Sequence, residues 1–430
     1  MRYTKAGAAL VLLLIITPTI QALEIINTNQ AGENPKIYGD IIVFEQNNEI
    51  KTYNIRNEQT KTIAKGNNPA IFANKIVFQT SEKQVNEDLN NNGQKTDTII
   101  QYYDLKNDKI INTELAGENP TIYSNKIAFS VNEEKEKIKL NNDEDKEDDI
   151  IMFYNIETKK LTNTKAAGNY PSTGPEYIIF ETQEKQQEYD LNGDKDKEDT
   201  IIRTYQYSTG GIENTFLIGS RPQNDKGVAV FSSNNEIIIY NADSGEQTKT
   251  GLKGQNPAKY KNIITYTNKG KLYTYNLKTK TCASLDIFGE KPAIFESTIV
   301  FITPEQKTGD LNNNGKQENI IRMLKSEDID KDGVPDIIDN CMEVPNKEQT
   351  DTDKDCIGDV CDKETPKPIR QEEKEKKIIT QEKKEKEKTK TRATKAPIIT
   401  IIILLITTAI FLIRYFSPRQ RRKRKKSFGF

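Results

Sequence analysis

The chain contains no histidine and no tryptophan, and it has only four cysteines in 430 residues. Without histidine, neither a Ser-His-Asp or Cys-His catalytic site nor a histidine-ligated zinc or iron site can be built. A charge excess of either sign is also absent, because 63 Lys and Arg residues balance 64 Asp and Glu residues. The composition therefore lacks the basic surplus typical of nucleic-acid binding, and we expect no nucleic-acid partner.

Long apolar runs occur only near the two ends of the chain. Residues 1–22 combine a basic start with an apolar core, which predicts a cleaved signal peptide, with an uncleaved membrane anchor as the alternative. Residues 396–416 form a second run, which at about 1.5 Å per residue can cross a hydrocarbon core of about 30 Å. Because the densest basic cluster follows at 417–430, we expect one transmembrane helix, an extracellular N-terminal domain and a short cytoplasmic tail.

All four cysteines fall on the expected extracellular side, where disulfides persist. None of them forms a Cys-x-x-Cys pair, and a cysteine-only zinc site would need all four, although Cys282 is remote from the other three. The spacing therefore favours disulfides over a metal.

A short motif recurs seven times between the two apolar runs. Its clearest copies are AGENPKIYGDIIVF at 31–44, KGNNPAIFANKIVF at 65–78 and AGENPTIYSNKIAF at 116–129. Its proline returns at intervals of 34, 51, 51, 51, 35 and 35 residues, and an aromatic residue stands nine positions after each proline. The prolines are Pro35, Pro69, Pro120, Pro171, Pro222, Pro257 and Pro292, and the aromatics are Phe44, Phe78, Phe129, Phe180, Phe231, Tyr266 and Phe301.

Each short repeat reads as four strands separated by polar turns, which predicts a β-propeller blade. The segment 24–35 matches 109–120, so it predicts a fourth strand that completes the last repeat and closes the ring. We expect an all-β, seven-bladed propeller over residues 23–325, with the aromatics packed between neighbouring blades. The motif resembles the Gly-x-Asn-Pro propeller repeats of prokaryotic, especially archaeal, surface proteins, a resemblance that implies the fold and no particular function.

Four of the repeats carry an insertion rich in Asp and Asn, which predicts a β-hairpin with a polar tip. Oxygens at alternate positions suit Ca²⁺, which takes about six to eight oxygen ligands. The insertions resemble the calcium loops of FG-GAP, integrin-like propeller blades, and a solvated polar turn is the alternative. The predicted ligands are Asp88, Asn90, Asn92 and Asp97 in the second repeat, Asp190, Asn192, Asp194 and Asp199 in the fourth, and Asp310, Asn312 and Asn314 in the seventh.

Two of these insertions depart from the pattern. In the third repeat Lys139 replaces the first Asp and leaves Asn141, Asp143 and Asp145, so calcium and a plain turn remain equally open there. In the seventh repeat the tenth position, counted from Asp310, is Asn319, whereas the other insertions have an Asp at that position.

Residues 326–362, which we call the neck, form a second acidic segment with little apolar surface to bury. Its carboxylates repel one another unless cations bind. The neck resembles a thrombospondin type 3 repeat, which implies an Asp-rich calcium-binding module with two loops; an acidic disordered spacer is the alternative. Gly333 holds the turn of the first loop, and Cys356 replaces glycine in the second. The implied ligands are Asp328, Asp330, Asp332, Asp336 and Asp339 in the first loop and Asp351, Asp353, Asp355, Asp359 and Asp362 in the second.

The same resemblance implies a disulfide between Cys341 and Cys361. Cys356 is then left over, and we hypothesise that it pairs with Cys282 in the outer strand of the sixth blade, which would dock the neck onto the propeller. After the neck, residues 363–395 are rich in Glu and Lys and predict a charged stalk, either helical or disordered.

Together these features favour a binding protein at the cell surface. A membrane-anchored, calcium-binding propeller suits adhesion, cell-envelope assembly or the docking of an extracellular protein or glycan. We expect that it is not an enzyme, because its carboxylates cluster in calcium-like spacing and not as an isolated acid and base. A propeller lyase or glycosidase and a purely structural envelope component are the alternatives.

Overall fold

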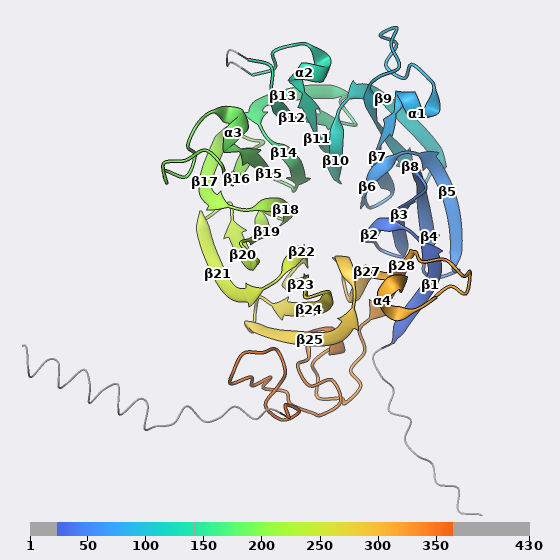
Figure 1. Ribbon diagram of the computed structural model, residues 1–430, viewed down its shortest axis with the longest axis vertical. Coiled ribbons are helices and arrows are strands. Elements are labelled where there is room, and N and C mark those ends of the chain that lie inside the picture. Colours follow the sequence, from blue (N-terminus) through green and yellow to red (C-terminus); the bar gives the residue numbers. More distant parts are fainter. Residues whose placement is uncertain (1–23, 142, 144, 364–430) are drawn as a thin grey trace, which may run out of the picture. The chain divides into compact units, whose positions relative to one another are not determined.

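Seven four-stranded antiparallel sheets stand in a ring in the computed structural model, which describes residues 24–141, 143 and 145–363 (Figure 1). The predicted all-β, seven-bladed propeller is confirmed. The signal peptide predicted at 1–22, the membrane helix at 396–416, the tail at 417–430 and the stalk at 363–395, apart from Lys363, lie outside the described residues. Among the described residues, none of the helices has both the length and the apolar character needed to span a membrane.

Three blades consist of four short strands joined by tight turns. The strands of these blades are, for blade 1, β2 (Glu33–Tyr38), β3 (Ile41–Gln46), β4 (Glu49–Asn54) and β5 (Gln59–Lys65); for blade 5, β18 (Ser220–Asp225), β19 (Val228–Ser233), β20 (Glu236–Asn241) and β21 (Glu246–Lys253); and for blade 6, β22 (Gln255–Tyr260), β23 (Ile263–Asn268), β24 (Lys271–Asn276) and β25 (Thr281–Phe288).

The other four blades have a one-turn helix and a long loop between their second and third strands. Their elements are, for blade 2, β6 (Asn67–Phe72), β7 (Lys75–Ser81), α1 (Glu82–Val85), β8 (Thr98–Asp104) and β9 (Lys109–Ala116); for blade 3, β10 (Glu118–Tyr123), β11 (Lys126–Asn132), α2 (Glu133–Glu136), β12 (Asp149–Asn155) and β13 (Lys160–Ala167); for blade 4, β14 (Asn169–Thr173), β15 (Tyr177–Gln183), α3 (Glu184–Gln187), β16 (Thr200–Gln206) and β17 (Ile212–Ile218); and for blade 7, β26 (Glu290–Phe295), β27 (Thr298–Pro304), α4 (Glu305–Thr308) and β28 (Asn319–Lys325).

Blade 7 is completed by the first strand of the chain. Strand β1 (Ile25–Ala31) pairs antiparallel with β28, with Ile26 opposite Met323 and Ala31 opposite Ile320. The sheet order is therefore β1-β28-β27-β26, so one blade contains both ends of the repeat array. This pairing closes the ring and covers a sheet edge that would otherwise be open to other chains.

The glycine and the aromatic of the repeat motif pack against each other. A Cβ added to Gly32 would lie 2.5 Å from Cδ2 of Phe44 and 2.9 Å from the carbonyl oxygen of Glu45, so this position has no room for a side chain. Phe44 is fully buried in a cluster that also contains Val300 and Met323 of blade 7. The repeated aromatic thus fills the core between adjacent blades, which explains why the two residues recur together.

The residue before the proline links blades 2, 3 and 5 to their predecessors. Asn68 has a left-handed φ of 51°, a conformation that Asn adopts more readily than most residues. Its backbone N–H donates to Oε1 of Glu45 in blade 1 at 2.8 Å, and the N–H of Asn119 donates to Oε1 of Gln79 in blade 2 at 2.7 Å. The Asn-Pro part of the motif therefore supplies hydrogen bonds between blades.

The neck packs against blade 6, as Figure 1 shows beside β24 and β25. Its short 3-10 helix η1 (Asp336–Ile338) buries Ile337 in a cluster with Leu272 and Leu285 of blade 6. The Thr274 hydroxyl donates to the carbonyl of Ile337, and the backbone N–H of Ser284 donates to the carbonyl of Cys356 at 3.0 Å. Apolar packing and hydrogen bonds therefore hold the neck on the propeller.

Candidate calcium sites

The first neck loop brings three of its five predicted carboxylate ligands together, and Asp336 and Asp339 are not part of this cluster. Asp328, Asp330 and Asp332 each place an oxygen within 4.8 Å of the others. The N–H of Gly333 donates to Oδ2 of Asp328 at 3.1 Å, and Gly333 adopts a φ of +91°, which glycine accepts without strain. The alternating spacing seen in the sequence therefore places these three predicted ligands together.

Several oxygens of this loop are buried without a hydrogen-bond partner. Asp336 and Asp339 are at most 1% exposed, and Oδ2 of each has no donor in the described structure. The same holds for Oδ1 of Asp328 and Oδ2 of Asp330. Burial raises the pKa of Asp330, Asp336 and Asp339 above the ordinary value for aspartate. Unpaired anionic oxygens in one loop fit a hard cation such as Ca²⁺, which would supply the missing partner.

The second neck loop repeats this backbone geometry with a cysteine in place of glycine. Asp351, Asp353 and Asp355 each place an oxygen within 4.8 Å of the others. Cys356 adopts a left-handed φ of +73°, and its N–H donates to Oδ2 of Asp351 at 3.0 Å, as Gly333 does in the first loop. The substitution of glycine therefore leaves the turn intact.

The remaining two predicted ligands of the second loop lie outside that cluster. Both oxygens of Asp359 accept hydrogen bonds from Thr352, one from its N–H and one from its hydroxyl, each at 2.8 Å. Asp362 follows Cys361, and its N–H donates to the carbonyl of Gly358 at 2.9 Å. Among the described residues, the four buried neck oxygens without a hydrogen-bond partner all belong to the first loop.

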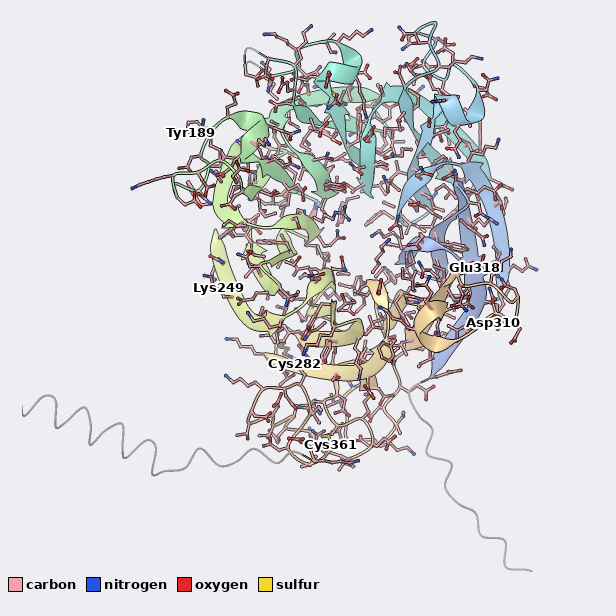
Figure 2. The ribbon with its side chains drawn as sticks, in the orientation of Figure 1. Tyr189, Lys249, Cys282, Asp310, Glu318 and Cys361 are labelled. Carbon is pink, nitrogen blue, oxygen red and sulfur yellow. A yellow bond between two sulfur atoms is a disulfide. The ribbon has the colours of Figure 1, made fainter. Side chains whose placement is uncertain are left out.

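Two disulfides brace the neck. Cys341 is bonded to Cys361 within the neck, and Cys282 of β25 is bonded to Cys356, with Cα atoms 4.9 Å apart in the second pair. Figure 2 labels Cys282 on blade 6 and Cys361 on the adjoining neck. The second bond ties the turn of the second acidic neck loop directly to the propeller.

In blade 2 the predicted ligands form a hydrogen-bonded network. Asp88 accepts the N–H groups of Asn92 at 3.1 Å and Gly93 at 2.8 Å. The side-chain amides of Asn90 and Asn92 both donate to Oδ2 of Asp97, at 2.8 and 2.6 Å. The four predicted residues thus lie together, with amide nitrogens facing the carboxylate of Asp97.

Blade 7 has the same network with one correction to the prediction. Asp310 accepts the N–H groups of Asn314 at 3.2 Å and Gly315 at 2.8 Å. The amides of Asn312 and Asn314 donate to Oε2 of Glu318, at 3.3 and 2.6 Å. Glu318, labelled with Asp310 in Figure 2, therefore occupies the place predicted for Asn319, which is the first residue of β28. This loop is one residue shorter than the others. The carboxylate of Glu318 is therefore at the ninth position from Asp310, and the prediction looked for it at the tenth.

Blade 4 gathers carboxylates differently from the prediction. Glu184, Asp196 and Asp199 each place an oxygen within 4.8 Å of the others, and of these three only Asp199 was among the predicted ligands. Asp190 instead caps the turn, since it accepts the N–H groups of Gly193 at 2.6 Å and Lys195 at 2.9 Å. The remaining predicted residues lie beside the cluster, where the Asn192 amide donates to Asp199 at 2.7 Å and to Asp194 at 3.2 Å.

A buried glutamate braces each of the four long loops, and the sequence analysis missed it. Oε1 of Glu82 accepts the N–H of Leu89 at 2.6 Å, and Oε2 accepts the N–H of Asp97 at 3.0 Å. The available signal was a glutamate five or six residues before the first position of each loop, directly after the second strand. The four glutamates, none more than 1% exposed, are Glu82, Glu133, Glu184 and Glu305.

An asparagine on the outermost strand holds each of these loops from the other side. The Asn214 amide donates to the carbonyl of Leu191 at 2.6 Å, and in blade 7 the Asn27 amide of β1 donates to the carbonyl of Leu311 at 2.7 Å. An Asn-Thr pair occurs in the outermost strand of all four blades that carry long loops, and that pairing was a signal available in the sequence. The Asn residues are Asn27, Asn112, Asn163 and Asn214.

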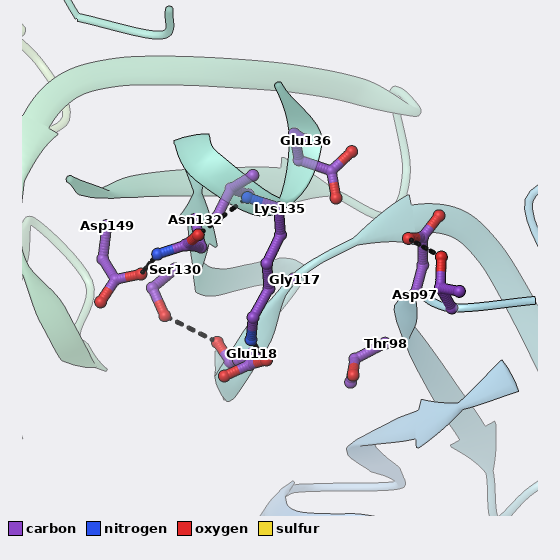
Figure 3. A pocket seen from close by; sticks show the side chains of 11 residues that line it. Asp97, Thr98, Gly117, Glu118, Ser130, Asn132, Lys135, Glu136 and Asp149 are labelled. Carbon is purple, nitrogen blue, oxygen red and sulfur yellow. Dashed lines mark hydrogen bonds and ion pairs between the residues drawn. The ribbon is translucent and has the colours of Figure 1, made fainter. Parts of the chain in front are cut away.

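A pocket of about 230 Å³ lies between the end of the long loop of blade 2 and strands β10, β11 and β12 with helix α2 of blade 3 (Figure 3). Its wall includes the carboxylates of Asp97, Glu118, Glu136 and Asp149 together with Lys135, which forms an ion pair with Glu118. Burial and the nearby Asp97 and Glu82 raise the pKa of Glu136. The pocket is thus acidic and lies at the edge of the calcium-like loops.

One comparison with known proteins supports the neck assignment. Residues 326–349 match the thrombospondin type 3 repeat model, and no curated protein matches the chain. The β-propeller domain of the Trilobed protease from Pyrococcus furiosus is 13% identical, with 69% of this chain and 93% of that chain covered and a TM-score of 0.47.

Two enzyme structures also resemble the chain. For an oligogalacturonate lyase in complex with manganese, the identity is 10%, the coverage is 69% of this chain and 78% of that chain, and the TM-score is 0.38. For the Pyrococcus horikoshii acylaminoacyl peptidase, the identity is 12%, the coverage is 68% of this chain and 51% of that chain, and the TM-score is 0.46.

These enzyme structures correct one prediction. We expected that the chain is not an enzyme, but propeller enzymes are among the structures that it resembles, so that exclusion was wrong. At these identities the resemblance concerns the fold alone and assigns no activity. The fold together with the Asp-rich repeat fits an extracellular calcium-binding protein.

Proposed function

We propose that this chain is a calcium-binding surface protein, anchored by its predicted C-terminal helix, whose propeller binds an extracellular protein or glycan in adhesion or cell-envelope assembly. The unpartnered oxygens of the first neck loop carry the calcium part of this proposal. Asp336 and Asp339 are buried, and leaving their oxygens unpaired costs free energy that a bound Ca²⁺ would remove.

The attachment of the neck to blade 6 supports a role for calcium in presenting the propeller. The Cys282–Cys356 bond joins the turn of the second loop to β25, and Ile337, between two predicted ligands of the first loop, is 1% exposed. Ions that order the two loops would therefore also stiffen the connection between the propeller and the neck.

Exposed aromatic residues on blade 4 support the partner-binding part of the proposal. Tyr189, labelled in Figure 2, is 68% exposed, and Phe216 is 64% exposed. Aromatic side chains are enriched where proteins contact partners and are costly to leave in water. Replacement of both by serine should weaken capture of the partner without changing thermal stability.

Thermal unfolding of the full chain tests the calcium part. We expect Tm to rise as Ca²⁺ increases from about 1 μM to about 10 mM, the range of sensor and extracellular sites, and to rise much less with Mg²⁺. Asp336→Asn should reduce the rise. The matched control is Glu348→Gln, which removes one charge from an exposed neck residue and should leave the rise unchanged. A wild-type Tm that ignores Ca²⁺ would contradict the proposal.

A further inference from the structure

Helix α2 and the long loop that follows it in blade 3 bring four carboxylates together. Glu133, Asp143, Asp145 and Asp148 each have an oxygen within 4.8 Å of the others. Glu133 and Asp148 are fully buried, whereas Asp143 and Asp145 are exposed. We propose that these residues form a Ca²⁺ site, separate from the neck and from the predicted ligands of the other blades.

Two oxygens of this cluster are buried without a partner in the described structure, Oε2 of Glu133 and Oδ1 of Asp148. The other oxygen of each is already occupied. Oε1 of Glu133 accepts the N–H groups of Leu140 and Asn141, the latter at 3.2 Å. Oδ2 of Asp148 accepts the amides of Asn141 at 2.8 Å and Gln187 at 2.7 Å. The unpartnered oxygens are therefore the ones available to a cation, and a cation removes the cost of burying them.

The donor set suits a hard divalent cation such as Ca²⁺. All four groups are carboxylates, which suit Ca²⁺ and Mg²⁺ better than soft transition metals. Opposite ligands of Ca²⁺ lie about 4.6–5.2 Å apart, against about 4.0–4.2 Å for Mg²⁺, because the metal–oxygen distances are about 2.3–2.6 and 2.0–2.1 Å. Four carboxylate oxygens within 4.8 Å of one another fit inside the coordination shell of Ca²⁺, whereas Mg²⁺ keeps several waters and is usually held by only one or two carboxylates.

The substitution of Lys139 for the first Asp does not remove the site. Glu133, which precedes the loop, is fully buried and contributes a carboxylate that the alternating loop pattern does not include. The amine of Lys139 reaches the backbone carbonyl of Asp143 at 3.5 Å, so this residue is directed to the loop backbone. Blade 3 therefore has four clustered carboxylates where the loop pattern alone suggested the weakest site.

The site also joins two blades. Gln187 is the last residue of α3 in blade 4, and its amide donates to Oδ2 of Asp148 in blade 3. An ion that fixes Asp148 would therefore hold this hydrogen bond between blades. Ca²⁺ should protect backbone amides on both sides of the junction from hydrogen exchange.

Calcium binding and hydrogen exchange on the full chain test the proposal. Asp143→Asn with Asp145→Asn removes two exposed ligands and leaves the buried core intact. This double variant should bind about one Ca²⁺ fewer per chain, with affinity at the site lowered at least about tenfold, because affinity follows the ligand charge. It should also lose the calcium-induced protection of residues 145–148 and 184–187. Glu147→Gln is the control, since it removes an exposed charge from the same loop outside the cluster, and it should retain both properties.

A second pair of variants separates this site from the neck. Glu133→Gln should also abolish the calcium-induced protection in blades 3 and 4, whereas Asp336→Asn in the neck should leave it unchanged. If Asp143→Asn with Asp145→Asn retains wild-type stoichiometry and protection, the blade 3 site is refuted and the neck proposal stands. If the double variant loses the calcium-induced protection in blades 3 and 4 and keeps it in the neck, both proposals hold. If the wild-type chain binds no Ca²⁺, both proposals are refuted.

Discussion

Cys356 is bonded to Cys282 and occupies, in the second neck loop, the turn position that Gly333 holds in the first. Its left-handed φ of +73° and its N–H bond to Asp351 reproduce the glycine geometry. One residue therefore closes a calcium-like loop and attaches that loop to the propeller. The stability of the loop and the docking of the neck are coupled through this position.

Loss of the Cys282–Cys356 bond should release the second loop from blade 6. The double variant Cys282→Ser with Cys356→Ser should destabilise the docked neck by about 2–4 kcal/mol, as expected for a disulfide that closes a long loop. Hydrogen exchange of residues 351–362 should accelerate. Cys341→Ser with Cys361→Ser is the comparison, because it removes the bond within the neck and keeps the attachment to β25; equal exchange at Ser284 in both variants would contradict the docking role.

The buried glutamates should be essential for the long loops. Glu184→Ala leaves the N–H groups of Leu191 and Asp199, at 2.6 and 3.1 Å from the carboxylate, without an acceptor. Each orphaned donor is only partly buried and costs about 1 kcal/mol, the low end of the usual range, so the variant should lose about 2 kcal/mol. Chemical denaturation measures this change. Glu198→Ala, an exposed glutamate of the same loop, should change stability by no more than about 0.5 kcal/mol, and a similar loss in both variants would refute the brace.

The contact between glycine and the aromatic ring should resist even one methyl group. Gly32→Ala introduces a Cβ 2.5 Å from the ring of Phe44, and we expect a loss of about 1–3 kcal/mol from overpacking. Phe44→Leu removes the ring edge and should also lower the free energy of unfolding. The double variant should lose less than the two single losses combined, since the two residues are in contact. Strict additivity in urea denaturation would argue against this contact.

The side-chain amide of the asparagine on the outermost strand should stabilise the long loop by donating a hydrogen bond to it. Asn214→Asp keeps an acceptor for the N–H of Phe216 and removes the donor to the carbonyl of Leu191. We expect a loss of about 1–2 kcal/mol and faster exchange in residues 189–199. Asn241→Asp provides the control, because that side chain accepts N–H bonds in a turn of blade 5, which has no long loop. Faster exchange in residues 189–199 in that control would oppose the assignment.

Much of the fold was predictable because its signals are local and repeated. Seven copies of one motif indicated seven blades, and the match between 24–35 and 109–120 predicted the closing strand that pairs with β28. Sequence alone also indicated the acidic neck, of which residues 326–349 match the thrombospondin type 3 repeat. The pairing of Cys282 with Cys356 remained a hypothesis at that stage, and the structure contains this bond.

The composition of the loops was predictable, but the full set of residues around each loop was not. Glu82 lies 15 residues from Asp97 along the chain, and Asn214 lies 23 residues from Leu191, so neither contact follows from the spacing of a single loop. Glu318 was missed because its loop is shorter by one residue, a difference that only the position of β28 shows.

The sequence by itself determined the number of blades, the order of strands and the residue types at the loop tips, since repetition and side-chain alternation act over a few residues. Only the tertiary structure decided which oxygens are buried without partners. Glu133 and Asp148 are close in space because β11 and β12 pair beneath them, and burial then removes the water that would have solvated their charge. A cation site depends on that combination of proximity and desolvation.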